Sequence, residues 1–343
     1  MELEIINPIY HKQWDDLVLN SKKCSFFHTS AWAKVLSKSY DYSPNYFTII
    51  KNNELKLLLP VMDIRSYLTG RRGVSLTFTD YCEPFLEKEE QFPELLDTVI
   101  RHGKKKGWKT IEFRGGGDFL HDKPVSAKYL GHTLDITGIT DKIFSSFRDS
   151  TRRNINKAVN EGVTIERSES LQSVQDFYRL HCLTRKKHGL PPQPKFFFQN
   201  IYNYIISKNK GFVVLASFNN QIIAGAIFFH HGHKAIYKYG ASDESFLRLR
   251  ANNLIMWEAI KWYSTNGYYS FCFGRSDYND KGLRQYKNGW GSVEREINYY
   301  KYDIINDKFM ESNKENNISK IYLQKMPLKI LQVVGHFMYR HMG

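Results

Sequence analysis

The chain has 343 residues, and its 49 Lys and Arg against 35 Asp and Glu give a formal net charge of +14. This length exceeds one small domain and fits two, and a hydrophobic fraction of 42% is ample for a sizeable core. No run of 18 apolar residues occurs, which excludes a membrane-spanning helix. The charge surplus favours polyanionic partners such as tRNA, an anionic membrane face or a phosphorylated substrate, although a Lys-rich composition alone would also produce it.

The cysteines and the first residues indicate a compartment. Cys24, Cys82, Cys182 and Cys272 lack CxxC spacing, so they predict neither a zinc site nor a disulfide framework. The opening MELEIINPIYHKQW carries charges where a signal peptide needs an apolar core. We therefore expect a cytoplasmic protein, soluble or peripheral to the inner face of the membrane.

The first half has the pattern of an α/β unit. Asn52 and Asn53 tolerate the left-handed conformation of a tight turn, so they predict a hairpin between two apolar runs. In chain order we expect a strand at 3–6, helices near 14–18 and 30–36, hairpin strands at 46–51 and 55–61, a basic loop at 65–73, a strand at 74–78, a helix at 90–102 and a strand at 110–114.

Basic residues mark the middle of the chain. Residues 140–162 read as one helix or two, with Arg152, Arg153 and Lys157 on a polar face that is either solvated or in contact with phosphates of a donor. The next helix ends in a basic cluster that contains Arg185 and His188, for which attraction to the helix C-terminus is a sufficient explanation.

The second half repeats the order of the first. Asn219 and Asn220 predict a hairpin of strands 212–218 and 221–229, and a strand at 235–239, a helix at 251–263 and a strand at 268–273 follow. The segments GWKTIEFRGG and GYYSFCFGRS are alike, and each lies some fifty residues beyond an Asn-Asn turn. We infer two copies of one α/β unit.

Polar side chains follow the last of these strands. Residues 274–285 read as a charged loop that contains Arg275, Asp277 and Tyr278, and Tyr286, Lys287 and Trp290 come after it between glycines. Such a loop is often only solvated, but a buried strand that ends in clustered charge can also deliver reactive groups to a pocket.

Three motifs resemble one family. The runs STRRNINKAVNEGV, LHCLTRKKHGLPPQPKFFF and FGRSDYNDKGLRQYKNGWG, in this order, are similar to the FemAB family of N-acyltransferases and to their BioF2-like and GNAT-like relatives, some of which build peptidoglycan cross-bridges from aminoacyl-tRNA. The resemblance implies an α/β (α+β) chain of two tandem GNAT-like domains, with mixed sheets flanked by helices. We expect domains at 1–140 and 141–307, the second with the active site, and a helical tail at 308–343.

The resemblance also implies site residues. Lys287 falls on the family's K-x-x-[FW]-G motif, where a lysine neutralises a developing oxyanion or a carrier phosphate. Asp277 is the candidate to accept a proton from the amine or to orient it, Arg275 stands beside it, and Tyr278 is a further acid. The candidate substrate and carrier contacts are Arg152, Arg153, Lys157, Arg185, His188, Arg248, Arg250, Tyr286 and Trp290.

One departure from the GNAT pattern concerns the donor. Acetyl-CoA enzymes of this fold hold the carrier pyrophosphate on an R/Q-x-x-G-x-G/A loop at a helix N-terminus. The matching residues 248–253 read RLRANN, so Ala251 and Asn253 replace both glycines, while Arg248 and Arg250 can still bind phosphate through their guanidinium groups.

Three functions remain open. The first is acyl or aminoacyl transfer to an amine of a cell-envelope or polysaccharide precursor, with aminoacyl-tRNA or another acyl carrier as co-substrate and no bound cofactor. The others are an acyl-CoA-dependent GNAT enzyme for a small molecule and a non-catalytic RNA-binding or membrane-binding module. No metal site is expected, since His230 and His231 point to opposite faces of a strand. The stretch from Ile318 either packs on the domain or lies on an anionic membrane.

Overall fold

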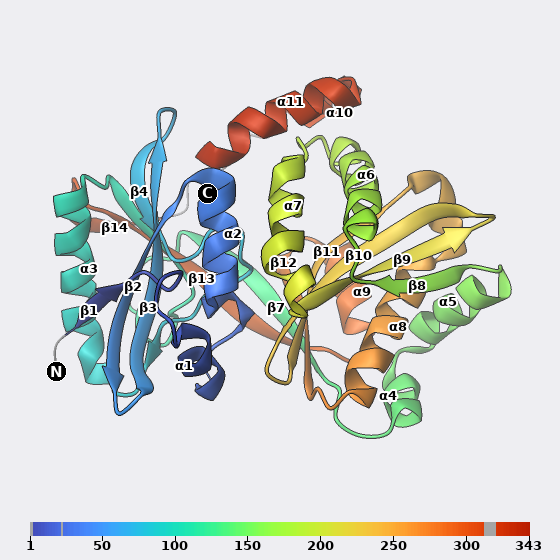
Figure 1. The fold of residues 1–343 in the computed structure, drawn as a ribbon, viewed down its shortest axis with the longest axis horizontal. Helices are drawn as coiled ribbons and strands as arrows, with labels where there is room; N and C mark the ends of the chain where they lie inside the picture. Colours follow the sequence, from blue (N-terminus) through green and yellow to red (C-terminus); the bar gives the residue numbers. More distant parts are fainter. Residues whose placement is uncertain (1–2, 22, 312–319) are drawn as a thin grey trace. The chain divides into compact units, whose positions relative to one another are not determined.

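A computed structural model describes residues 3–21, 23–311 and 320–343, which form two compact units (Figure 1). Unit 1 comprises Met1–Tyr129, Glu296–Glu315 and Met338–Gly343, and unit 2 comprises Leu130–Arg295 and Asn316–Phe337. The units differ from the expected ranges because two long strands, β7 (Ala127–Asp135) and β13 (Val293–Asp303), each contribute residues to both, and because the last residues belong to unit 1.

Unit 1 is a twisted sheet with helices. Its strand order is β1-β2-β3-β4-β6-β13, and β5 and β14 pair with β3 and β13. The elements are β1 (Glu4–Ile6), α1 (Trp14–Asn20), α2 (Ser30–Tyr40), β2 (Ser43–Lys51), β3 (Glu54–Ser66), β4 (Gly70–Val74), β5 (Phe85–Leu86), α3 (Phe92–Lys106), β6 (Thr110–Arg114) and β14 (Lys308–Met310).

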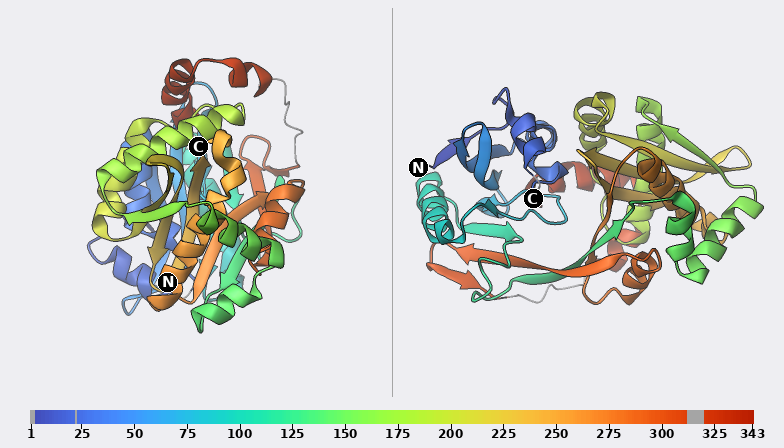
Figure 2. Two further views of the ribbon diagram at one scale, coloured as in Figure 1. Left: turned by 90° about the vertical axis from the view of Figure 1, so that its right-hand side faces the viewer. Right: turned by 90° about the horizontal axis from the view of Figure 1, so that it is seen from below.

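Unit 2 repeats this order as β8-β9-β10-β11-β12-β7 (Figures 1 and 2). Its elements are α4 (Thr140–Ser146), α5 (Asp149–Asn160), β8 (Thr164–Ser168), α6 (Leu171–Lys187), α7 (Lys195–Tyr204), β9 (Gly211–Phe218), β10 (Gln221–His231), β11 (Lys234–Ser242), α8 (Ala251–Thr265), β12 (Ser270–Asp277), α9 (Lys281–Asn288), α10 (Lys320–Lys325) and α11 (Leu328–Met338).

The repeat predicted from the Asn-Asn pairs is confirmed in the strand pairing. Asn52 and Asn53 connect β2 to β3 with φ of 52° and 58°, and Asn219 and Asn220 connect β9 to β10 with φ of 49° and 61°. Positive φ at both central residues is the requirement of a two-residue hairpin loop. In each unit the next strand pairs antiparallel with the hairpin and then parallel with the strand that follows the long helix. The chain therefore has the tandem architecture predicted from sequence.

Several sequence-based boundaries were wrong. The basic stretch at 65–73 is the end of β3 and the start of β4, rather than a loop. The predicted strand at 74–78 does not form beyond Val74, because Leu76 and Phe78 both have φ of 56°. The expected loop at 274–285 contains the end of β12 and most of α9. Part of the predicted tail at 308–343 lies outside the described residues. No helix among the described residues is long and apolar enough to cross a membrane.

Both faces of the unit 2 sheet are covered. Phe212, Val214 and Ala216 of β9 share a buried cluster with α8, whereas Leu215 points to the other face, toward Phe177 of α6. Because both faces are buried, β9 is apolar at every position from 211 to 216.

One buried histidine on α6 makes unit 2 sensitive to acid. His181 packs with ring centroids 4.8 Å from Phe198 and 6.0 Å from Phe177, and burial together with the charge of Arg185 lowers its pKa to about 3. In the unfolded chain a histidine binds its proton near pH 6.5. Between pH 7 and pH 5 the unfolded state therefore gains a proton that the folded state does not.

We expect the His181 side chain to lower the free energy of unfolding by about 2 kcal/mol between pH 7 and pH 5. In His181→Phe this contribution to the loss of stability should be absent. Denaturant titrations at pH 7 and pH 5 test it, with exposed His121→Phe as the control. An equal loss of stability in the wild type and in His181→Phe would contradict the assignment.

Candidate active site

A kink in β12 creates the binding place for the Lys287 side chain. Successive carbonyls of a regular strand point to opposite sides. Gly274 has φ of 70°, however, which breaks this alternation, and the carbonyls of Gly274 and Arg275 both accept hydrogen bonds from Lys287 Nζ, at 3.1 and 2.8 Å. Lys287 is 3% exposed. Its ammonium group is thus fixed beside the end of β12.

Helix α9 carries Lys287 and begins directly after the β12 turn. Asp280 caps it by accepting a hydrogen bond from the Leu283 amide at 2.9 Å. Asp277 ends β12 and Tyr278 begins the turn before α9, and both are exposed. The Asp277 carboxylate accepts a hydrogen bond from the Asn279 amide at 3.3 Å. The Arg275 side chain is partly buried just before them.

Strands β11 and β12 separate beside this kink. They pair in parallel only from Lys234 to Ile236 of β11, although each strand continues for at least five more residues. Ile227 of β10 faces Tyr239 and the next residue, Phe228, faces Tyr237, so the register shifts and β11 carries a bulge at this point. The parallel pairing of the two strands therefore ends beside the kink.

The N-terminus of α8 lies at a cavity of about 220 Å³ in unit 2. Within the described part of the chain no side chain caps this helix, and Arg250 precedes it with φ of 60°. In the first turn the Asn253 amide donates to the Arg250 carbonyl at 2.9 Å. An uncapped helix start offers free amides and a partial positive charge to an anion. The cavity is lined by Ile223, Ala224, Ser242, Asp243, Phe246, Leu247, Arg250, Ala251, Asn252, Asn253 and Tyr286.

Tyr286 joins α9 to this cavity. Burial, with a smaller contribution from the nearby Tyr237, raises the pKa of Tyr286, so its phenol is neutral at pH 7 and can donate a hydrogen bond. Trp290 is 0% exposed and packs on Phe147 and Phe273, at 5.0 and 6.2 Å between ring centroids. The Trp290 side chain therefore lies in the core behind the cavity.

A second hollow of about 470 Å³ shares Ser242 and Asp243 with the first. Its other walls include Lys186 and Lys187 at the end of α6 and Gln324 of α10. The two hollows together follow the end of β11.

The basic residues predicted on α5 and α6 have different surroundings. Arg152 pairs with Asp149 and donates to the Ser145 carbonyl at 2.7 Å, whereas Arg153 and Lys157 are exposed. The start of α5 is tied to the end of α9, since Thr151 Oγ1 donates to the Gly289 carbonyl at 3.0 Å.

The end of α6 faces the turn before α9. Arg185 Nε donates to the Pro191 carbonyl at 3.2 Å. Burial, Lys187 and Arg185 lower the pKa of His188, and Asp280 acts in the opposite direction, which places Asp280 close to His188. Arg248 is exposed in the loop before α8 and does not line the cavity.

Sequence reasoning missed His132, which lies close to Lys287, and Glu294, which contacts two other residues of α9. His132 of β7 is fully buried, with Nδ1 3.8 Å from Glu294 Oε1, and burial with the charge of Lys287 lowers its pKa to about 4. Glu294 accepts from Arg284 at 3.2 Å and from Asn288 at 3.0 Å. Neither β7 nor β13 was predicted, so no pattern indicated that these side chains would meet α9.

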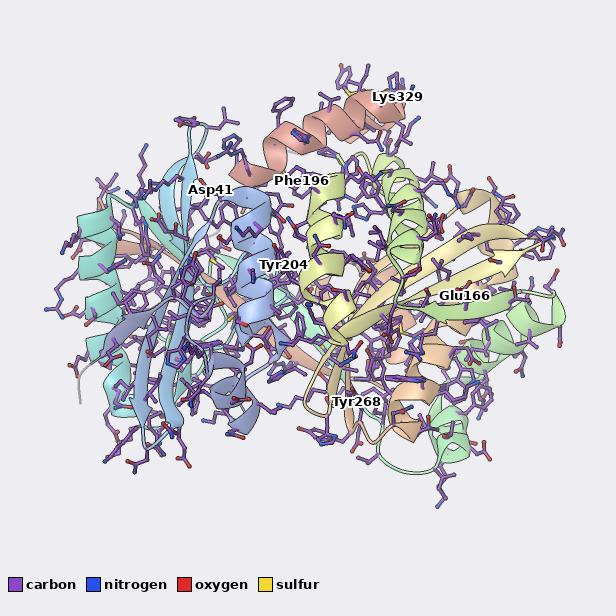
Figure 3. The ribbon with its side chains drawn as sticks, in the orientation of Figure 1. Asp41, Glu166, Phe196, Tyr204, Tyr268 and Lys329 are labelled. Atoms are coloured by element: carbon purple, nitrogen blue, oxygen red, sulfur yellow. The ribbon has the colours of Figure 1, made fainter. Side chains whose placement is uncertain are left out.

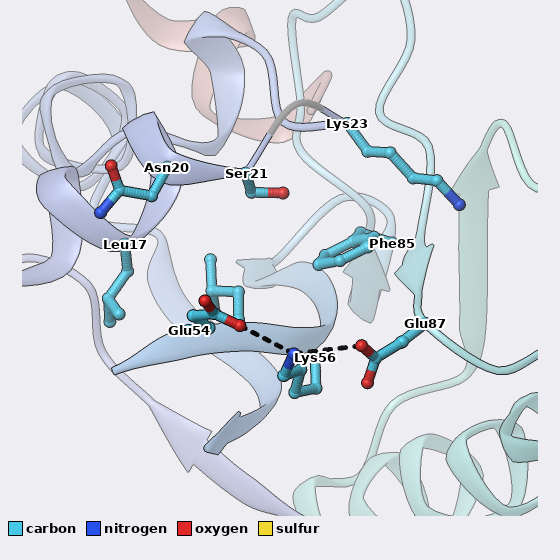
Figure 4. A pocket seen from close by; sticks show the side chains of 9 residues that line it. Leu17, Asn20, Ser21, Lys23, Glu54, Lys56, Phe85 and Glu87 are labelled. Atoms are coloured by element: carbon cyan, nitrogen blue, oxygen red, sulfur yellow. Dashed lines mark hydrogen bonds and ion pairs between the residues drawn. The ribbon is translucent and has the colours of Figure 1, made fainter. Parts of the chain in front are cut away.

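Unit 1 contains a separate hollow of about 390 Å³, shown in Figure 4. Lys56 bridges Glu54 and Glu87 there, at 2.8 and 3.0 Å. With Lys23, which also lines the hollow, two lysines oppose two glutamates, so the formal charges balance and we place no charged substrate there. Among the described residues, no group of three or more His, Cys, Asp or Glu could hold a metal ion.

The sequence and the fold were compared with known proteins. Residues 145–288 match the family model for the acetyltransferase (GNAT) domain, and no curated protein matches the chain. The crystal structure of FemX aligns with a TM-score of 0.67 at 15% identity and covers 87% of this chain and 97% of its own.

Two further structures share the fold. The C-terminal domain of a putative lysylphosphatidylglycerol synthetase from Agrobacterium fabrum aligns with a TM-score of 0.55 at 14% identity, over 84% of this chain and 89% of that one. A tandem GNAT protein from the clavulanic acid biosynthesis pathway aligns with a TM-score of 0.57 at 6% identity, over 88% and 98%. Residues 145–288 thus match a GNAT acetyltransferase domain, which supports an acyltransferase activity, and the chain has the FemAB-like fold that its motifs predicted.

Proposed function

We propose that unit 2 transfers an acyl or aminoacyl group from a phosphate-bearing carrier to an amine of a cell-envelope or polysaccharide precursor. The observation that carries the proposal is the uncapped start of α8 at a cavity that Tyr286 also lines, one residue from the buried Lys287. A carrier phosphate at the helix amides would direct the acyl group toward the opening between β11 and β12.

Helix α3 of unit 1, which corresponds to α8 of unit 2, has a start that disfavours a phosphate, so we assign carrier binding to unit 2 alone. Helix α3 has Pro93 in its first turn, which removes an amide donor, and Glu94 beside it, with Glu89 and Glu90 just before. Carboxylates at a helix start compete with a phosphate for the same positive end of the dipole. We infer one carrier per chain.

In the reaction the amine nitrogen attacks the acyl carbon, and the carbonyl oxygen becomes an oxyanion. We assign Lys287 to the stabilisation of this charge and Asp277, assisted by Arg275, to orienting the amine and accepting its proton. The new N–C bond forms as the bond to the carrier breaks, and the carrier leaves as a hydroxyl or a thiol after it takes up a proton. Tyr286 and Tyr278 are the candidate donors of that proton.

The shape of the α8 cavity favours an aminoacyl ester of tRNA over coenzyme A. Ala251 and Asn253 line the cavity, so side chains occupy the two places where glycines let a backbone approach a pyrophosphate. The FemX fold and the basic charge of the chain are consistent with tRNA as the carrier. The acceptor in this proposal is an envelope precursor, which can be lipid-linked.

A direct assay distinguishes the donors. The purified chain is incubated with labelled aminoacyl-tRNA or with acyl-CoA, each with an amine acceptor, and formation of the amide is measured. Transfer from aminoacyl-tRNA alone supports the proposal. Transfer from acyl-CoA alone would favour the small-molecule GNAT enzyme instead, and no transfer from either donor would favour a non-catalytic module.

Binding of tRNA should depend steeply on salt. Arg153 and Lys157 lie four residues apart on α5 and are exposed, whereas Arg152 is held by Asp149. A plot of log K for tRNA binding against log salt has a negative slope. If Arg153 and Lys157 contact phosphates, Arg153→Ala with Lys157→Ala should make this slope less steep by about 0.7 to 0.9 for each lost contact. Arg101→Ala with Lys105→Ala, at the same spacing on α3, is the control. Equal slopes for the two double variants would assign Arg153 and Lys157 to a solvated face.

A further inference from the structure

Helix α11 has an apolar ridge on its outward side. Ile330, Val333 and Phe337 are 50%, 56% and 65% exposed and lie three and four residues apart, so they share one face of the helix. Leu331 and Gly335 are buried on the opposite side. An amphipathic helix normally turns its apolar stripe inward, but here apolar side chains occupy both sides.

The contacts of α10 and α11 with unit 2 fix which side points outward. A Cβ atom at Gly335 would lie 2.0 Å from the Pro192 carbonyl oxygen, so the helix backbone packs directly on the segment before α7. His336 lies against Phe196 of α7, at 5.3 Å between ring centroids (Figure 3), and Gln332 Nε2 donates to Cys182 Sγ at 3.4 Å. The ridge cannot rotate inward without the loss of these contacts.

The C-terminal segment that contains the ridge carries charge of one sign. Residues 320–343 contain Lys320, Lys325, Lys329 and Arg340 and neither Asp nor Glu. Lys325 and Lys329 are exposed, and Figure 3 labels Lys329 on α11. A second copy of the same face would bring like charges together, and RNA phosphates would leave the apolar ridge uncovered. An anionic lipid surface matches both the apolar side chains and the positive charges.

We propose that α11 docks unit 2 onto an anionic membrane surface, with Ile330, Val333 and Phe337 inserted among the lipids and Lys325 and Lys329 at the headgroups. This inference is independent of the acyl-transfer proposal. None of the residues that we assign to membrane binding is one that we assign to catalysis.

Vesicle co-sedimentation of the full chain tests the proposal. Vesicles of phosphatidylglycerol mixed with phosphatidylcholine should bind the wild-type chain, and vesicles of phosphatidylcholine alone should bind it at least tenfold more weakly. Val333→Asp with Phe337→Asp should reduce binding to the anionic vesicles more than tenfold. Lys325→Ala with Lys329→Ala should reduce it about fivefold for each lost charge.

The control variant replaces an exposed apolar residue elsewhere in unit 2 with a charged one. Ile139 is 63% exposed before α4, so Ile139→Asp should bind vesicles as the wild type does. Thermal melts check that each variant is folded, and the lysine variants remain informative if the aspartate pair unfolds. Equal binding to both lipid mixtures, or wild-type binding by the lysine variants and by a folded aspartate pair, would overturn the proposal. So would loss of tRNA binding by these variants with lipid binding unchanged.

Discussion

Replacing Lys287 with alanine is expected to lower the rate of acyl transfer a hundredfold to a thousandfold, about 3 to 4 kcal/mol of transition-state stabilisation. The physical reason is preorganisation, because the Gly274 and Arg275 carbonyls hold the ammonium group before the oxyanion forms. Lys281→Ala, in the exposed first turn of the same helix, should change the rate by less than about 0.5 kcal/mol. Single-turnover transfer from the donor identified by the assay measures both.

The same two hydrogen bonds give Lys287 a second role. Without the ammonium group, two carbonyls near the kink lose a donor, which costs about 1 to 3 kcal/mol for each group that stays buried without a partner. The melting temperature of Lys287→Ala should therefore fall. Lys287→Gln separates the roles, since its side-chain amide can still donate to the carbonyls but carries no charge. Turnover near that of the wild type in folded Lys287→Ala would remove Lys287 from the reaction and leave Arg275 and Asp277 as the next candidates.

The repeat was predictable from sequence because its signals are local. Asn52 and Asn219 each begin a pair that accepts positive φ, and that requirement holds whatever surrounds the turn. The prediction of a strand at 74–78 was wrong. Leu76 and Phe78 are residue types that favour strands, but the chain turns at both with positive φ. Leucine and phenylalanine rarely adopt that conformation, so no residue type signalled the turn.

The candidate site was predictable where its residues belong to a short motif, as at 275–290 and at Arg250, which lines the α8 cavity. Residues 275–290 stay together in any fold, and the FemAB resemblance already marked them. His132 and Glu294 reach α9 from β7 and β13, the two strands that carry residues of both units. Their placement depends on the pairing of strands far apart in sequence, for which one sequence contains no local signal. The role of the Gly274 conformation likewise has no local signal in the sequence, because it depends on the hydrogen bonds that Lys287 donates to the Gly274 and Arg275 carbonyls.

Trp290→Ala is expected to lower the free energy of unfolding by about 3 to 5 kcal/mol, the usual cost of removing a large aromatic side chain from a core. Trp290 is 0% exposed and contacts Phe147 of unit 2, Phe273 of β12 and Tyr286 of α9. Loss of the indole would leave a cavity under the strand and the helix that hold Lys287. Transfer should therefore also fall, as a consequence of the disturbed packing.

Stability and binding distinguish this expectation from the carrier contact predicted from the sequence. A core residue lowers the denaturation midpoint when it is truncated, and Trp290→Phe should recover much of the loss because a phenyl ring refills most of the space. A carrier contact would instead weaken donor binding at an unchanged midpoint. Denaturant unfolding of both variants, followed by donor binding under conditions where each is folded, decides between them. A Trp290→Ala protein with the stability of the wild type would show that the indole is not part of the core, and the carrier contact would then be the role to test.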